Sequence, residues 1–279
     1  MAGVDFAFLD SGTGGIPYML SLADKQKSAS CVYLGDTAHF PYGEKSSEQI
    51  KECAFMAVKL MIKKWNPKTI IIACNTISVT ALDFLRKEFP SVPFVGTVPA
   101  IKLAAKVTKN KRIGFLATRA SVNHPYSQHL IDEFAGNCTV LRRGDPQLVE
   151  FIEKKYFKAT KEERIAGIKP ALDFFIENGC DTIILGCTHF THVAKLMQET
   201  AGEKIKIIDS REGVSNQALK VEKEFCLTNR ELNPAEKDCS PVAANKSIFV
   251  TNAGIPETEE YKILCSSLGI PWGGIVNFS

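Results

Sequence analysis

Short apolar runs rich in β-branched residues alternate with longer amphipathic segments along this chain. The runs predict buried strands, and the segments between them predict helices with one apolar face. Strands are expected at residues 4–9, 31–35, 94–97, 112–117, 138–141, 205–209 and 247–251, and in two runs that end at Cys74 and Cys187. Because strands and helices alternate regularly, we expect an α/β fold of parallel sheets with helices on both faces.

Capping residues mark several of the expected helix ends. Ser46 and Thr160 each begin a capping box, and Asp145-Pro146 is an N-cap followed by a proline in the first helical position. Helices are expected from residue 46 and over residues 124–135, 146–157, 160–179 and 212–226, with a polar loop at 228–246. Pro170 lies inside one of these helices and should break or kink it.

One strand–cysteine–helix unit occurs twice in the chain. The sequence Thr69-Ile-Ile-Ile-Ala-Cys74-Asn-Thr matches Thr182-Ile-Ile-Leu-Gly-Cys187-Thr-His, and the strands that follow align at the same offset. We therefore expect two related halves, each with a cysteine at the carboxyl end of a buried strand. Ligands of α/β folds bind at that end of the strands.

Composition argues against several classes of function. The chain has 279 residues, a net charge of +3 and no run rich in Lys and Arg, so no nucleic-acid partner is expected. It contains no apolar stretch or leader that predicts a membrane span or a signal peptide. Nine cysteines are an odd number for a disulfide framework, so we expect a reduced, cytoplasmic protein. The absence of a CxxC pair argues against a metal site.

Two thiols from related halves suit the transfer of a proton between the two faces of one carbon atom. Each thiol then needs a group that takes its proton or adjusts its pKa. Asp10 is the candidate partner for Cys74, while His189 and the auxiliary Glu150 are candidates for Cys187. Short polar side chains that could hold a charged substrate are Ser11, Asn75, Thr76, Ser121 and Thr188.

Three other classes of protein are alternatives. A cysteine hydrolase or amidase could use Cys187 as nucleophile and His189 as base. A thiol phosphatase would require an arginine several residues after its cysteine, and neither cysteine has one nearby. A ligand-binding protein without catalytic activity could share the same architecture. The second cysteine argues against all three, since none of them needs it.

Four motifs in order resemble those of the glutamate racemase family. They are Asp10-Ser-Gly-Thr-Gly-Gly, Asp36 with Pro41-Tyr42-Gly43, Ala73-Cys-Asn-Thr and Gly186-Cys-Thr-His. The Thr-His pair after Cys187 favours glutamate over the substrates of the related aspartate and hydantoin racemases, which remain the alternative. The resemblance covers essentially the whole chain. It implies racemisation of glutamate without a cofactor or metal, supplying D-glutamate for peptidoglycan.

The resemblance also implies roles for individual residues. Cys74 would take the α-proton from D-glutamate with the help of Asp10, and Cys187 would take it from L-glutamate with the help of His189. The α-groups of the substrate would be held by Asn75, Thr76 and Thr188, and its side-chain carboxylate by Ser11 and the backbone of Pro41, Tyr42 and Gly43. Asp10 and Ser121 would also belong to the substrate-binding residues. Two α/β domains are implied, of residues 1–97 with 208–279 and of residues 98–207, in a homodimer with the site between the domains.

Three positions depart from the family pattern. Thr191 stands where proline is expected, Ser121 where threonine is common, and Arg211 where a small residue is usual. None of them is a predicted proton-transfer group.

Overall fold

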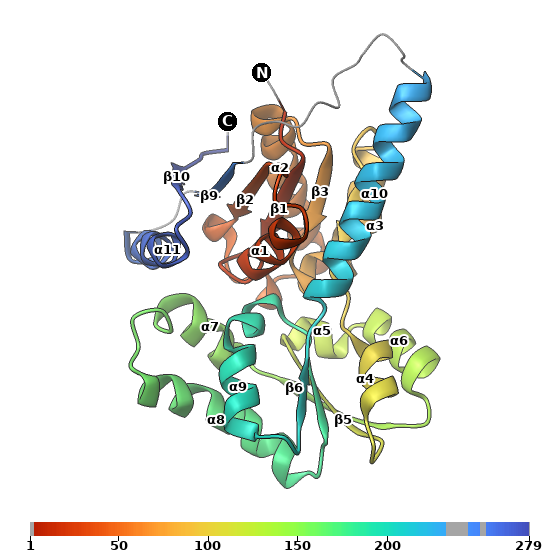
Figure 1. Ribbon diagram of the computed structural model, residues 1–279, viewed down its shortest axis with the longest axis vertical. Helices are drawn as coiled ribbons and strands as arrows, with labels where there is room; N and C mark the ends of the chain where they lie inside the picture. The colour runs from red at the N-terminus through yellow and green to blue at the C-terminus, as the bar shows by residue number, and fades with distance from the viewer. Residues whose placement is uncertain (1–2, 233–244, 252–254, 279) are drawn as a thin grey trace.

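Two parallel β-sheets form the framework of the molecule in a computed structural model that describes residues 3–232, 245–251 and 255–278 (Figure 1). The strands of the first sheet, in spatial order, are β10 (Trp272–Ile275), β9 (Lys246–Val250), β2 (Cys31–Gly35), β1 (Phe6–Asp10), β3 (Thr69–Ile72) and β4 (Phe94–Gly96). Those of the second are β6 (Thr139–Gly144), β5 (Arg112–Ala117), β7 (Thr182–Leu185) and β8 (Lys206–Ile208). All the strand pairs described are parallel. The expected α/β class is confirmed.

Helices cover both faces of each sheet. Those around the first sheet are α1 (Ile16–Lys25), α2 (Ser47–Trp65), α3 (Asn75–Glu88), α10 (Arg211–Leu232) and α11 (Ile255–Leu268). Those around the second are α4 (Ile101–Val107), α5 (Arg119–Asn123), α6 (Pro125–Ala135), α7 (Pro146–Lys154), α8 (Lys161–Glu177) and α9 (Ala194–Ala201). Short 3-10 helices lie at Thr37–His39 (η1), Tyr42–Glu44 (η2) and Thr188–Val193 (η3).

Alternate side chains of each strand enter different cores. Phe6 and Phe8 of β1 pack with α1, α10 and α11, whereas Ala7 and Leu9 pack with α2 and α3. This division follows from the two-residue period of a strand. Every residue of β1 is buried, because helices cover the sheet on both sides. The second sheet has the same arrangement, with separate cores on its two faces.

The predicted internal repeat is visible in the strand order. The order β2-β1-β3-β4 in the first sheet corresponds to β6-β5-β7-β8 in the second. Cys74 follows β3 and Cys187 follows β7, so the two cysteines occupy equivalent places. The copies differ after the cysteine, where α3 begins directly at Asn75 but η3 precedes α9 in the second copy.

The predicted capping residues are confirmed. Ser46 and Thr160 each accept a hydrogen bond from the backbone N–H three residues on, and both capping boxes are complete. The Asp145 side chain accepts from the N–H of Leu148 at 3.0 Å. Each bond satisfies an N–H that lacks a partner within its helix.

Some expected elements differ from the structure. Pro170 neither ends nor divides α8, since buried neighbours on both sides of this exposed proline hold the helix to the second sheet. Helix α7 ends at Lys154 instead of continuing to residue 157, and α10 extends into the predicted polar loop as far as Leu232. Residues 233–244 of that loop lie outside the described part of the chain. Strand β10 was not predicted.

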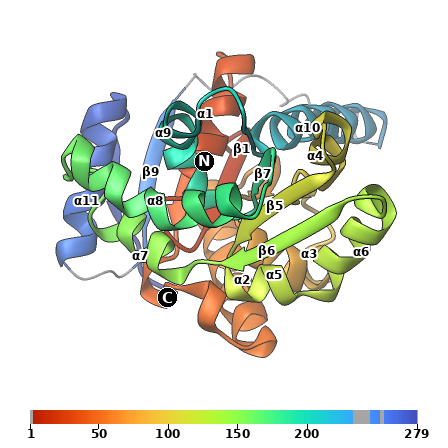
Figure 2. The same ribbon diagram turned by 90° about the horizontal axis from the view of Figure 1, so that it is seen from below.

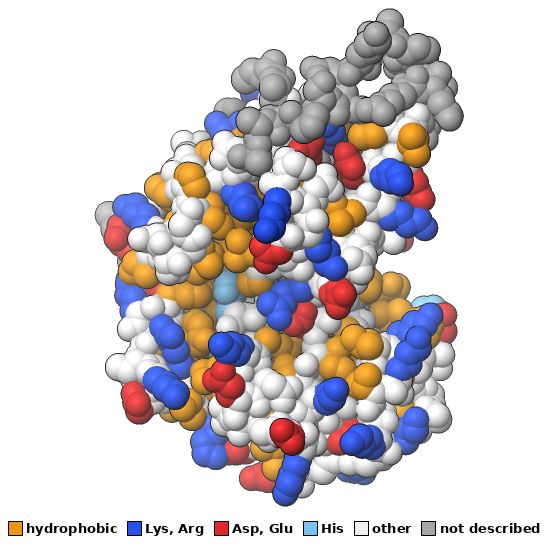
Figure 3. Space-filling view, in the orientation of Figure 1, with side chains coloured by type: hydrophobic (Ala, Val, Ile, Leu, Met, Phe, Trp, Pro, Cys, Tyr) orange, Lys and Arg blue, Asp and Glu red, His pale blue; other side chains and the backbone are white. Residues whose placement is uncertain are grey.

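The chain crosses between the two sheets after β4 and again after β8. Helices α7 and α11, from different halves, lie side by side (Figure 2). On the face shown in Figure 3, Lys and Arg are interspersed with Asp and Glu. No helix within the described residues is long and apolar enough to cross a membrane.

Candidate active site

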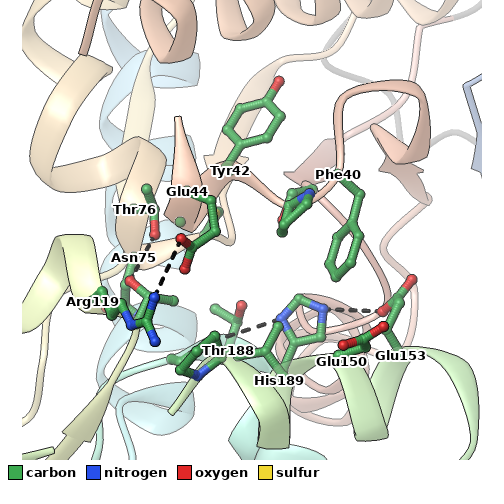
Figure 4. Close-up of a pocket in the computed structure, with 18 of the residues that line it drawn as sticks. Phe40, Tyr42, Glu44, Asn75, Thr76, Arg119, Glu150, Glu153, Thr188 and His189 are labelled. Atoms are coloured by element: carbon green, nitrogen blue, oxygen red, sulfur yellow. Dashed lines mark hydrogen bonds and ion pairs between the residues drawn. The ribbon is translucent and has the colours of Figure 1, made fainter. Parts of the chain in front are cut away.

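A cavity of about 360 Å³ lies between the two halves, at the carboxyl ends of both sheets (Figure 4). Its wall is formed by Ser11, Thr37, Phe40, Pro41, Tyr42, Gly43, Glu44, Cys74, Asn75, Thr76, Thr118, Arg119, Pro146, Val149, Glu150, Glu153, Lys154, Cys187, Thr188 and His189. Of the residues predicted from the sequence to form the site, all except Asp10 and Ser121 are in this wall. The cavity therefore collects side chains from both copies of the repeat.

Both cysteines are positioned by the ends of their strands. Cys74 is the N-cap residue of α3, and Cys187 is the N-cap residue of η3. Each has an extended backbone, is buried and carries a free thiol. A strand that runs directly into a helical turn places the residue at the junction at the sheet edge, where it faces the cavity.

Asp10 lies behind the cavity wall, next to Cys74. Its carboxylate accepts hydrogen bonds from Ser11 N at 2.7 Å and from Thr188 Oγ1 at 3.0 Å. Complete burial raises the pKa of Asp10 to about 6, although the charge of His189 opposes this shift. Burial and the neighbouring Asp10 carboxylate raise the pKa of the Cys74 thiol well above its usual range. Cys74 is therefore protonated near neutral pH, while Asp10 is mostly ionised.

Cys187 is paired with a buried histidine and a buried carboxylate. The Cys187 Sγ atom lies 3.8 Å from His189 Nδ1, and His189 Nε2 lies 3.0 Å from Glu153 Oε2. Burial disfavours the imidazolium, but the hydrogen bonds to Cys187 and Glu153 outweigh it and raise the pKa of His189 well above its usual range. Because Glu153 accepts a hydrogen bond from Nε2–H, Nδ1 is the ring atom that faces the thiol, and the raised pKa of His189 favours transfer of the thiol proton to this atom.

Glu153, and not the predicted Glu150, is the carboxylate that contacts His189. Glu150 lies one helical turn earlier, lines the cavity and pairs with Lys154 at 3.0 Å with its side chain mostly exposed. Burial alone would raise the pKa of Glu153, but hydrogen bonds from His189 and Thr13 lower it below its usual value. The sequence does carry a signal for Glu153, because this acidic residue directly follows Ile152 in the buried stripe of α7.

Thr118 takes the place that was expected for Ser121. Ser121 is fully buried behind the wall, and its Oγ atom accepts a 3.0 Å hydrogen bond from Thr118 Oγ1. Thr118 is the N-cap of α5 and its hydroxyl accepts a hydrogen bond from Ser121 N, whereas Ser121 is in the first turn of this helix. The Thr118 hydroxyl lies 3.2 Å from that of Thr76, which joins the two halves.

Asn75 presents an unpaired amide to the cavity. Both its Oδ1 and its Nδ2 atoms are buried without a hydrogen-bond partner in the structure. Buried polar groups are usually paired, and an unpaired one is destabilising. A side chain that is both unpaired and part of a cavity wall is suited to bind a polar ligand.

The loop after β2 closes another side of the cavity. Asp36 is completely buried and accepts hydrogen bonds from Tyr42 at 2.5 Å and Thr251 at 2.8 Å, and it pairs with His39. These bonds fix the Tyr42 ring, and the Phe40–Pro41 peptide beside it is cis. Across the mouth, Glu44 and Arg119 form an ion pair at 3.8 Å between the halves (Figure 4).

The other two departures from the family pattern, Thr191 and Arg211, have local partners. The Thr191 hydroxyl donates to the carbonyl of Thr188 at 2.7 Å, and Arg211 pairs with Asp209 at 2.7 Å. Within the described residues, no group of three or more His, Cys, Asp or Glu side chains could hold a metal ion together.

Comparison with known proteins gives consistent matches over the chain. The family model described as Asp/Glu/Hydantoin racemase matches residues 19–215. A glutamate racemase of Treponema pallidum is 35% identical over 273 residues, covering 98% of this chain and 96% of that protein. A glutamate racemase of Proteus mirabilis is 40% identical over 203 residues, covering 72% of this chain and 70% of that protein.

Solved structures agree in fold. Escherichia coli glutamate racemase, in complex with L-glutamate and the activator UDP-MurNAc-Ala, has a TM-score of 0.81 and 25% identity, covering 99% of this chain and 98% of that one. Francisella tularensis glutamate racemase, in complex with D-glutamate, has a TM-score of 0.71 and 25% identity, covering 100% of this chain and 98% of that one. The chain therefore belongs to the Asp/Glu/Hydantoin racemase family and is an isomerase.

Proposed function

We propose that this enzyme interconverts L- and D-glutamate by passing the α-proton between the enzyme's two cysteine thiols, without a cofactor. The observation that carries the proposal is that Cys74 and Cys187, from repeated halves, line one cavity and each has its own acid–base partner. The named substrates of the relatives support glutamate as the substrate. We also propose the division into domains of residues 1–97 with 208–279 and of residues 98–207.

In the L-to-D direction, the Cys187 thiolate is the base. Transfer of the thiol proton to His189 Nδ1 forms a thiolate–imidazolium pair, which the ionised Glu153 stabilises. The thiolate then takes the α-proton, and the electron pair of the broken C–H bond remains on the substrate as a carbanion. The Cys74 thiol donates its proton to the opposite face and becomes a thiolate. The D-to-L direction is the same sequence in reverse, with Asp10 as the partner of Cys74.

The polar wall supplies ligands for the substrate. We propose that Asn75, Thr76 and Thr188 hold its α-groups, and that Ser11, Thr118 and the backbone of residues 41–43 hold its side-chain carboxylate. The unpaired amide of Asn75 supports this assignment, because a bound ammonium or carboxylate would satisfy it. Hydrogen bonds to charged groups contribute about 1.5–3 kcal/mol each.

We further propose that the enzyme acts in the cytoplasm as a homodimer and that its D-glutamate serves peptidoglycan synthesis. These statements rest on the resemblance to the glutamate racemases.

Incubation of the enzyme with D-glutamate in D₂O, without added pyridoxal phosphate or metal, tests the proposal. We expect optical rotation to decay while deuterium enters the α-position of the L-product, and we expect C74S and C187S to be inactive yet folded. Activity on D-aspartate alone would change the substrate and keep the mechanism. Full activity of either serine variant would exclude the two-thiol scheme. Formation of a covalent acyl intermediate on Cys187 would instead indicate an amidohydrolase.

A further inference from the structure

The Glu153 carboxylate has one fully used oxygen and one unused oxygen. Its Oε2 atom accepts from Thr13 N at 2.8 Å, from Thr13 Oγ1 at 2.7 Å and from His189 Nε2 at 3.0 Å. Its Oε1 atom is buried and has no hydrogen-bond partner in the structure. An ionised, buried carboxylate with a bare oxygen is destabilising unless a donor reaches it.

The hydroxyl of Tyr261 is a hydrogen-bond donor without a partner near the Glu153 carboxylate. This residue belongs to α11 of the first half and is completely buried, and its hydroxyl also lacks a hydrogen-bond partner. A Cβ atom on Gly35 would lie 2.7 Å from the Tyr261 hydroxyl and 3.1 Å from Gly12 O, while one on Gly12 would lie 2.6 Å from Glu153 Oε2. Gly35 therefore neighbours both Tyr261 and Gly12, and Gly12 neighbours Glu153, which places the hydroxyl and the carboxylate in the same buried region.

The other titratable groups around Glu153 are already engaged. Tyr33 from β2 donates to Gly12 O, and His192 from η3 lies 2.9 Å from Thr13 O. His189 is bound to Oε2. Burial and the charge of Glu153 raise the pKa of Tyr261 well above its usual range, so this phenol remains an O–H donor.

A second contact holds α11 against the segment that follows α7. Lys158 pairs with Glu260 at 2.8 Å, and the Glu260 side chain is buried. Because Glu260 directly precedes Tyr261, this ion pair is a second contact between α11 and the half that carries Glu153.

We propose that Tyr261 is a positioning residue for the Cys187 half of the reaction, donating a hydrogen bond to Glu153 Oε1 directly or through one water molecule. The bond holds Glu153 ionised and oriented, Glu153 holds the Nε2–H of His189, and His189 presents Nδ1 to the thiol. The C-terminal helix of the first half thereby acts on the proton-transfer group of the second. The expected kinetic effects rest on the proposed function, whereas the hydrogen bond and the titration of Glu153 do not.

Tyr261→Phe tests the proposal, because it removes only the hydroxyl. Loss of a donor to a carboxylate raises the pKa of that carboxylate, so we expect Glu153 to titrate about one pH unit higher in Y261F. The probe is ¹³C NMR of δ-¹³C-glutamate-labelled protein, with E153Q used to assign the signal. Y156F is the matched control, since its hydroxyl contacts His192 O at 3.4 Å instead of Glu153.

The kinetic readout separates positioning from a purely structural role. We expect kcat/KM of Y261F to be about tenfold lower than that of the wild type, which corresponds to a loss of about 1.4 kcal/mol of transition-state stabilisation. We also expect a larger deuterium isotope effect for L-glutamate and a smaller one for D-glutamate. Unchanged titration of Glu153 in Y261F would overturn the proposal, as would lower activity with unaltered isotope effects. If Y261F does not fold, 3-fluorotyrosine at position 261 keeps the ring with a stronger donor, and the pKa of Glu153 should then fall below that of the wild type. An enzyme that lacks racemase activity but shows the predicted Glu153 shift would reject the proposed function and retain the contact.

Discussion

Thr188 Oγ1 donates a 3.0 Å hydrogen bond to Asp10 Oδ2, and this bond links the carboxylate beside Cys74 to the residue that follows Cys187. Thr188 directly follows Cys187, while Asp10 interacts with the Cys74 thiol. The two residues are 178 positions apart in the sequence and come from different halves, since Asp10 ends β1 and Thr188 begins η3. The proposed proton-transfer groups are therefore joined by a contact between the two halves.

Asp10 should determine the acidic limb of the pH–rate profile. Its pKa is raised to about 6, so the carboxylate is charged above pH 6 and neutral below it. We expect kcat/KM to fall as the pH decreases through about 6 and D10N to lose this limb, with activity at pH 8 lower by roughly 10²-fold. An acidic limb that persists unchanged in D10N would assign it to another group.

The same substitution should increase stability. The folded pKa of Asp10 exceeds the value of 3.8 for an unperturbed carboxyl, so the folded state holds this proton more tightly. Its contribution to the free energy of unfolding therefore decreases as the pH rises from about 4 to about 6, by on the order of 3 kcal/mol. D10N should be more stable than the wild type at pH 7, and the difference should shrink toward pH 4. Urea unfolding at several pH values measures this, and equal stabilities at pH 7 would contradict it.

Glu153→Gln should impair one proton transfer selectively. We expect a loss of roughly 10²-fold in kcat/KM, and this loss must be equal in both directions because the enantiomers have equal free energies. The asymmetry should appear in the isotope effects, since Cys187 acts first on L-glutamate. In E153Q the isotope effect with α-deuterated L-glutamate should be larger than in the wild type, and that with α-deuterated D-glutamate should be smaller. D10N should show the opposite pattern.

Glu150→Gln is the matched control, one helical turn away. Its exposed pair with Lys154 contributes at most about 1 kcal/mol, so the loss should not exceed about fivefold. A larger effect of E150Q than of E153Q would restore Glu150 as the partner of His189.

Much of the fold could be predicted because the strands are fully covered. The runs before Cys74 and Cys187 consist of apolar and β-branched residues, all of which are buried. A continuous run of this kind predicts a strand that is covered on both faces of its sheet. Strand β10 gave no such signal, since Gly273 and Gly274 form half of it and glycine has a low strand propensity. The continuation of α8 through Pro170 depends on tertiary packing, which local propensity does not include.

The position of a site residue could be predicted where only one residue near a strand end has the required chemistry. It could not be predicted where two similar residues lie close together in the sequence. The cysteines end their strands, so their position follows from the strand itself. The choice between Glu150 and Glu153 depends on which face of α7 meets η3, and the choice between Thr118 and Ser121 depends on the cap geometry of α5. The first choice depends on a tertiary contact and the second on local cap geometry, and the sequence pattern alone identifies neither.

Pro170→Ala should stabilise the enzyme without changing its activity. Proline inside a helix removes a backbone hydrogen bond, and Pro170 is exposed and remote from the cavity wall. We expect an increase of about 1–3 kcal/mol in the free energy of unfolding. Pro146→Ala is the control, because proline at the start of α7 is favourable and its removal should give no gain. A destabilised P170A would show that the proline relieves strain in α8.

Asn75→Ala should separate binding from stability. The amide of Asn75 has no hydrogen-bond partner in the structure, so its removal leaves no other buried group unpaired, and stability should be unchanged or slightly higher. Activity should fall by about tenfold to a hundredfold in kcat/KM, as expected for a lost hydrogen bond to a charged substrate. Asn110→Ala is the converse control, because that amide bonds Gly179 O at 2.9 Å and the N–H of Arg112 at 2.9 Å, remote from the cavity wall. It should lose about 1 kcal/mol of stability and keep its kinetics. If N75A instead loses stability and retains its activity, Asn75 supports the fold and the substrate's α-groups are held elsewhere in the wall.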